Sequence, residues 1–159
     1  MNVTRVFIHG LESTSRGTKG EFFRINFPGM ILEDFTGPLD ERMSKLNRLL
    51  QDKRDLVLVG SSYGGLMAAI YACRNPRKVR KLILLAPALN LIEFHLHLND
   101  CIDIPVFLYH GYLDDVVPPK DVQAIAQKVF THLSYHAVDD DHPLTRTFGS
   151  MVWDDLLRV

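Results

Sequence analysis

The chain has 159 residues, of which 47% are hydrophobic and 23% charged, and its formal net charge at pH 7 is −1. This length predicts a single domain over residues 1–159, large enough to bury about two-thirds of its unfolded surface without disulfides. The nearly neutral charge gives no electrostatic reason to expect a nucleic acid or an anionic membrane as a partner. The composition is that of an ordinary globular protein.

The N-terminal segment and the cysteines bear on the location of the protein. The apolar run at residues 6–8 is too short for the core of a signal peptide. No segment approaches the roughly 18 apolar residues of a membrane span. Two cysteines, Cys73 and Cys101, are too few for a disulfide framework. We therefore expect free thiols and a cytoplasmic location.

Short apolar segments alternate along the chain with segments of helical spacing. The apolar segments are rich in Val, Ile and Leu, as is typical of strands buried on both faces of a parallel sheet. These predicted strands are residues 3–9, 30–35, 55–60, 81–86, 105–110 and 133–138. Apolar residues at helical spacing predict helices at residues 39–52, 62–75, 119–131 and 143–157. The alternation predicts an α/β fold whose ligands bind beyond the carboxyl ends of the strands.

The strongest motif joins the predicted strand at residues 55–60 to the helix that follows it. Gly60, Ser62 and Gly64 form a Gly-x-Ser-x-Gly pattern, in which a tight turn holds the serine above the sheet and excludes bulky neighbours. The positive N-terminal end of the helix would then face an oxyanion formed at the serine. We predict that Ser62 is a nucleophile. The alternative is that Ser61 and Ser62 only cap the helix.

Acidic and basic side chains follow two other predicted strands. Asp114 and Asp115 come after the strand at residues 105–110, and His142 comes after the last strand. A serine hydroxyl is a poor nucleophile until an imidazole takes its proton, and the imidazole needs a carboxylate to fix its tautomer. Because the carboxyl ends of parallel strands share one edge of the sheet, we expect these groups to meet Ser62 there.

Together these motifs resemble the α/β-hydrolase superfamily, and specifically its small esterase-like members. The resemblance spans residues 3–142, and the residues that carry it are His9, Gly10, Gly60, Ser62, Gly64, His110, Gly111, Asp114 and His142. It implies a catalytic triad of Ser62, Asp114 and His142, in the chain order that this fold uses. Asp115 stays open as the alternative acid.

The same resemblance implies an oxyanion hole built from two backbone N–H groups. One is the amide of Tyr63, directly after the nucleophile, and the other is the amide of Leu11, with Glu12 as the alternative. The histidine of the His-Gly motif, His9, is expected to be structural. From loop position alone, the candidates for the acyl-binding walls are Tyr63, Phe94, Leu96, Leu113 and Val116.

The chain departs from larger members of the superfamily in its size. They insert a cap domain between the strands that correspond here to residues 81–86 and 105–110. Only the 18 residues 87–104 lie between these strands in this chain. We therefore expect a reduced hydrolase fold, with a mostly parallel six-stranded sheet, helices on both faces and no cap. The absence of a cap weakens any inference toward lipases, epoxide hydrolases or dehalogenases.

The resulting prediction is a serine hydrolase that cleaves small carboxylic esters or thioesters through an acyl-enzyme on Ser62. No cofactor and no metal are expected; His95 and His97 are weak evidence for a metal site and are expected to have a surface or rim role. The alternatives are an acyltransferase or a peptidase that uses the same triad, and a non-catalytic binding module on the same fold. The sequence specifies neither the acyl group nor the oligomeric state.

Overall fold

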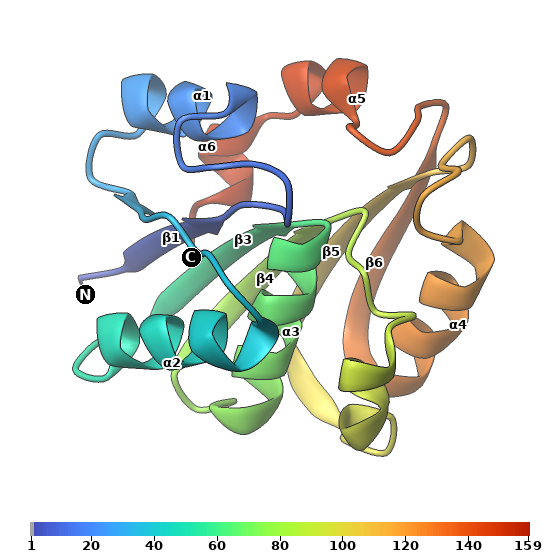
Figure 1. The fold of residues 1–159 in the computed structure, drawn as a ribbon, viewed down its shortest axis with the longest axis horizontal. Coiled ribbons are helices and arrows are strands. Elements are labelled where there is room, and N and C mark those ends of the chain that lie inside the picture. Colours follow the sequence, from blue (N-terminus) through green and yellow to red (C-terminus); the bar gives the residue numbers. More distant parts are fainter. Residues whose placement is uncertain (1) are drawn as a thin grey trace.

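Six parallel strands form one sheet in the computed structural model, which describes residues 2–159 (Figure 1). Their order across the sheet is β2-β1-β3-β4-β5-β6. The strands are β1 (Thr4–Ile8), β2 (Ile31–Leu32), β3 (Leu56–Ser61), β4 (Val79–Leu85), β5 (Ile102–Gly111) and β6 (Phe130–Val138). The predicted reduced α/β fold is confirmed, and all strand pairs in the described part of the chain are parallel.

Helices cover both faces of the sheet, as predicted (Figure 1). One face carries α2 (Leu39–Leu50), α3 (Tyr63–Arg74) and α4 (Pro119–Val129). The other carries α1 (Thr18–Asn26), α5 (Thr145–Ser150) and α6 (Trp153–Leu156). Between β4 and β5 lies only a short 3₁₀ helix, η1 (Ile92–His97), so no cap interrupts the described fold. Among residues 2–159, no helix has the length and apolar character needed to cross a bilayer.

The C-terminal helix predicted at residues 143–157 is two short helices, and this part of the prediction was wrong. Met151 is extended and breaks the helix between α5 and α6. Phe148 and Trp153 are both buried, with ring centroids 4.9 Å apart. Five residues apart on one continuous helix, they would point in widely different directions. The break therefore lets both rings enter the core.

Alternate residues of the central strands enter the two core layers. On β3, Leu56 and Leu58 face α2 and α3, whereas Val57 and Val59 face the α1 side. All four side chains have no exposed surface. This explains the unbroken apolar runs in the sequence, since a strand covered on both faces has no solvent-exposed side.

Phe23 anchors α1 to the second core layer. Its ring is fully buried, with centroids 5.1 Å from Phe7, 5.6 Å from Phe148 and 4.8 Å from Trp153. The sequence predicted no helix here, although α1 connects the loop after β1 to β2. Aromatic contacts, rather than a strong helical pattern, therefore hold this segment on the sheet.

Replacing Phe23 with alanine is expected to lower the free energy of unfolding by about 3–5 kcal/mol, because it leaves a cavity among the surrounding aromatic rings. Urea denaturation followed by circular dichroism measures this loss. Ile25→Ala, on the same helix but 74% exposed, is the matched control and is expected to change stability by less than about 0.5 kcal/mol. Equal losses in the two variants would contradict this account of the core.

Candidate active site

Ser62 lies on a sharp turn between β3 and α3. Its backbone has φ 55° and ψ −114°, a conformation that is rare and strained for a residue with a side chain. The neighbouring strand fixes the turn, because the Ser62 amide donates to the Leu85 carbonyl at 2.9 Å and the Ser62 carbonyl accepts from the Ala88 amide at 3.0 Å. The Ser62 hydroxyl makes no capping bond to α3. The capping alternative therefore does not describe this serine.

Two glycines allow α3 to approach the sheet at this turn. A Cβ atom at Gly64 would overlap the backbone carbonyls of Ile8 and His9 at the end of β1. A Cβ at Gly60 would overlap the Gly64 backbone in the same way. The spacing of the motif thus reflects direct backbone contact between β1, β3 and α3. This contact aims the N-terminus of α3 at the edge where the strands end.

The three predicted triad residues lie in one hydrogen-bonded chain. The Nε2 atom of His142 is 2.9 Å from the Ser62 hydroxyl oxygen, and its Nδ1 atom is 2.7 Å from Asp114 Oδ2. With Asp114 ionised, Nδ1 carries the proton and donates it, which leaves the Nε2 lone pair to accept from the serine hydroxyl. Asp115 is exposed, whereas Asp114 is buried. Of the two candidate acids, only Asp114 contacts the histidine.

The Asp114 carboxylate is held by several donors in a buried position. Its Oδ1 atom accepts from the amides of Val116 and Val117, both at 2.8 Å, and its Oδ2 atom is also 3.1 Å from His110 Nε2. Burial raises the pKa of Asp114, but the bonds from Val117, His142 and Val116 outweigh burial, so the pKa lies below its ordinary value. A fixed negative charge therefore lies beside the imidazole of His142 at neutral pH.

The loop that carries Asp114 is tied to the loop that carries His142. The Tyr112 amide donates to Val138 O at 3.0 Å, and the Leu113 amide donates to Asp140 O at 3.2 Å. A Cβ at Gly111 would overlap the same Asp140 carbonyl. The glycine of the His-Gly-x-x-Asp motif thus allows the two loops to meet. This contact sets the distance between the acid and the histidine.

The loop after β1 is fixed by His9 and Arg42. The His9 ring is buried, with Nδ1 2.7 Å from the Gly10 carbonyl, and its Nε2 accepts from the Phe35 amide at 2.9 Å. Burial lowers the pKa of His9, as suits a neutral ring that donates at one nitrogen and accepts at the other. Arg42 donates to the carbonyl of Leu11 at 3.4 Å. The structural role expected for His9 agrees with these bonds, which hold the backbone on either side of the Leu11 amide.

A cavity of about 580 Å³ opens beside the serine. Leu11 and Tyr63, the residues proposed for the oxyanion hole, both line it. Within residues 2–159, neither of their amides donates a hydrogen bond to the protein. Both residues thus line the cavity together with Ser62, and their N–H groups have no partner among the described residues.

The structure places only some of the residues predicted as acyl-binding walls at the cavity. Tyr63 and Val116 line it, but Phe94 and Leu113 do not. The η1 turn directs Phe94 into the core, where it is fully buried, whereas Leu113 is 59% exposed at the surface. Leu96, on the outer side of η1, is 83% exposed and does not line it either. Residues that the sequence did not indicate take these places: Phe7, Lys19, Ala88, Asn90 and Leu91.

A family model described as alpha/beta hydrolase fold matches residues 12–101. The chain belongs to the α/β-hydrolase family. Mouse alpha/beta hydrolase domain-containing protein 10 has a similar structure, with a TM-score of 0.80 at 22% identity over 99% of this chain and 90% of the mouse chain. No sequence among curated proteins matches the chain. The assignment to the family therefore rests on the family model. The solved structures show in addition that the fold is similar.

Two microbial structures extend this likeness. Est1E from Butyrivibrio proteoclasticus, solved with ferulic acid bound, is 15% identical over 99% of this chain and 90% of its own, with a TM-score of 0.74. The esterase Pf2001 from Pyrococcus furiosus is 18% identical over 96% of this chain and 79% of its own, also with a TM-score of 0.74. Both structures thus share the fold of this α/β-hydrolase chain over nearly its whole length.

The lowered pKa of Asp114 predicts how the stability of this α/β hydrolase depends on pH. Since the folded pKa is below the unfolded one, the stabilisation is complete above the unfolded value of about 3.9 and is lost as pH falls through the folded value. We expect the free energy of unfolding of the wild type to drop steeply below about pH 4. Asp114→Asn is expected to be less stable at neutral pH and to show a shallower drop, because asparagine does not titrate.

Urea denaturation between about pH 3 and pH 7 measures the free energy of unfolding of both proteins as a function of pH, over a range chosen for an aspartate carboxyl group. Asp115→Asn is the matched control, since its side chain is exposed on the same loop, and it should keep the wild-type slope. Parallel profiles for the wild type and Asp114→Asn would show that this carboxylate is not held in the charged form.

Proposed function

We propose that the chain is a serine hydrolase that cleaves carboxylic esters or thioesters through an acyl-enzyme on Ser62. The observation that carries this proposal is the hydrogen-bonded chain from Ser62 through His142 to Asp114. A strained serine at a helix N-terminus, an imidazole in contact with it and a buried carboxylate behind the imidazole are the parts of a serine nucleophile.

Each part has a role in the proposed reaction. His142 takes the hydroxyl proton as the Ser62 oxygen attacks the acyl carbon, and Asp114 stabilises the imidazolium that forms. The amides of Leu11 and Tyr63 donate to the oxyanion. His142 then gives its proton to the leaving alcohol or thiol as the bond to the acyl carbon breaks. Water, deprotonated by His142, attacks the acyl-enzyme and releases the acid with Ser62 restored.

The shape and lining of the cavity support a small acyl substrate. Its volume of about 580 Å³ lies within the usual range for small-molecule pockets. Leu11, Leu91 and Val116 give it apolar walls near the nucleophile. The esterase Pf2001 and Est1E, solved with ferulic acid, have the same fold. We therefore propose a small ester or thioester as the substrate, rather than a nucleic acid or a membrane lipid.

The exposure of the histidine favours hydrolysis over acyl transfer. The His142 side chain is 18% exposed, and no cap covers it within the described residues. Water therefore has direct access to the base, as the second step of hydrolysis requires. We also propose a cytoplasmic location, which suits the free thiols of Cys73 and Cys101.

Ser62→Ala is expected to reduce ester hydrolysis at least about 10⁴-fold and to abolish labelling by a fluorophosphonate probe, because no other group replaces the nucleophile. Release of p-nitrophenol from a short-chain ester measures turnover, and gel fluorescence measures labelling. The matched control is Ser61→Ala, which removes the adjacent hydroxyl and should keep both signals. Undiminished labelling of Ser62→Ala, or no labelling of the wild type, would end the proposal.

Leu11→Pro is expected to lower kcat about 10²- to 10³-fold with little change in KM, because proline removes the N–H proposed to bind the oxyanion. Leu11→Ala keeps the amide and is the matched control. Steady-state kinetics on one ester, with circular dichroism to check folding, compares the two variants. Equal kcat values in folded Leu11→Pro and Leu11→Ala would remove this amide from the oxyanion hole.

A further inference from the structure

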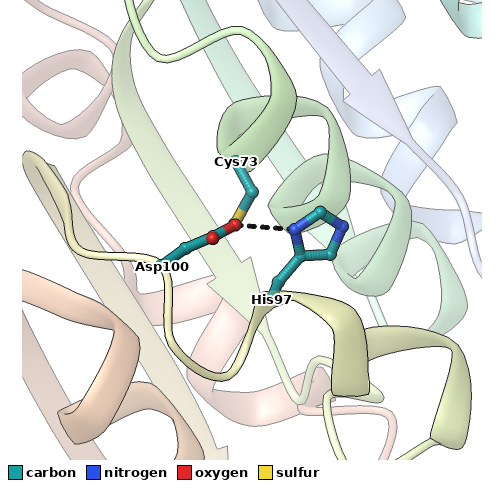
Figure 2. A group of neighbouring side chains, drawn as sticks. All are labelled: Cys73, His97 and Asp100. Atoms are coloured by element: carbon teal, nitrogen blue, oxygen red, sulfur yellow. Dashed lines mark hydrogen bonds and ion pairs between the residues drawn. The ribbon is translucent and has the colours of Figure 1, made fainter.

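Three side chains with different metal-binding groups meet at the C-terminal end of α3 (Figure 2). Cys73 lies in the last turn of α3, His97 ends η1, and Asp100 follows in the turn before β5. Their ligand atoms all lie within 4.8 Å of one another. The surface position expected for His97 was wrong, because this residue is only 8% exposed.

We propose that Cys73, His97 and Asp100 form a binding site for a divalent transition-metal ion of the zinc class. A thiolate, an imidazole and a carboxylate are the ligand types that zinc takes in proteins, whereas magnesium and calcium prefer oxygen alone. The thiolate and the carboxylate together carry two negative charges, which a divalent ion neutralises.

The distances allow such an ion after a small rearrangement, in which Nδ1 of His97 and Oδ2 of Asp100, now 2.7 Å apart, move apart and the longer ligand–ligand distances shorten. Zinc bonds of about 2.0–2.3 Å place neighbouring ligand atoms of a tetrahedral site roughly 3.3–3.8 Å apart. The present limit of 4.8 Å therefore requires a movement of about 1 Å. Asp100 has the freedom to make it, since its side chain is 38% exposed. The same exposure leaves the fourth coordination position open to water.

The orientation of His97 points to the cluster. Its Nδ1 atom faces Asp100 Oδ2 at 2.7 Å, whereas its Nε2 atom is buried without a hydrogen-bond partner among the described residues. A buried, unpaired nitrogen is unfavourable. The ring is thus oriented with Nδ1 toward the thiol and the carboxylate, although this orientation leaves Nε2 without a hydrogen bond.

The position of the site separates it from the proposed hydrolysis. Cys73 is eleven residues beyond Ser62, which is about 16 Å along a helix. The ion would connect the end of α3 to the segment between β4 and β5. Because Asn90 and Leu91 of that segment line the cavity, the metal would stabilise one cavity wall without taking part in the chemistry.

Titration with Co²⁺, a spectroscopic substitute for zinc, tests the proposal. We expect a thiolate-to-cobalt charge-transfer band that saturates at one ion per chain, disappears on addition of Zn²⁺ and persists with excess Mg²⁺. Cys73→Ser is expected to abolish the band, and Asp100→Asn to weaken Co²⁺ binding at least about 10-fold. The matched control is Cys101→Ser, because Cys101 is exposed and adjacent to Asp100 but outside the cluster; it should keep the band.

The thermal midpoint supplies a second readout, since an ion that binds only the folded state raises it with concentration. Zn²⁺ should raise the midpoint of the wild type and of Cys101→Ser but not of Cys73→Ser. No charge-transfer band in the wild type, a band that survives in Cys73→Ser, or one lost in Cys101→Ser would overturn the site. When both proteins are metal-free, Cys73→Ser should hydrolyse the ester at the same rate as the wild type. This measurement keeps the test of the metal site separate from the test of the proposed function.

Discussion

The structure depends on one close contact, in which the backbone at the start of α3 lies directly against the end of β1 with no side chain between them. Gly64 makes this contact with the carbonyls of Ile8 and His9. It fixes where α3 begins, and therefore where Ser62 turns out of the sheet. It also brings the loop after β1 next to the turn, so that Leu11 and Tyr63 both line one cavity. The same backbone contact therefore determines both how α3 packs on the sheet and where Ser62 lies.

A buried carboxylate organises the opposite side of the site. An ionised group without partners would be strongly destabilised in the protein interior, so Asp114 needs donors around it. The amides of Val116 and Val117 supply two of them, and His142 supplies a third. Since two of these donors belong to the Asp114 loop itself, the carboxylate orders its own loop. The histidine is then oriented by a group that is already rigid.

The sequence predicted the features that arise from local steric or solvation rules, and it missed those set by packing between distant segments. Apolar runs revealed the buried strands, and the glycine spacing revealed the turn at Ser62. The motif favoured Asp114, but Asp115 stayed open because the pattern alone does not separate two adjacent acids on one loop. Phe94 was misplaced because the short 3₁₀ helix η1 decides whether its side chain enters the cavity or the core. The proximity of Cys73 and His97 was missed because β4 lies between them in the sequence and no residue spacing indicates it.

Packing, rather than helix propensity, stabilises α3 and the strained turn before it. Two consecutive glycines, Gly64 and Gly65, each disfavour a helix by about 1 kcal/mol, and the backbone of Ser62 costs about 1–3 kcal/mol more. Full burial of a side chain such as Leu66 or Ile70 contributes about 1.5–3 kcal/mol, and residues 64–72 are all buried. The apolar face of α3 therefore more than offsets the local cost. This burial is why the helix tolerates the strained turn at Ser62 before its first residue.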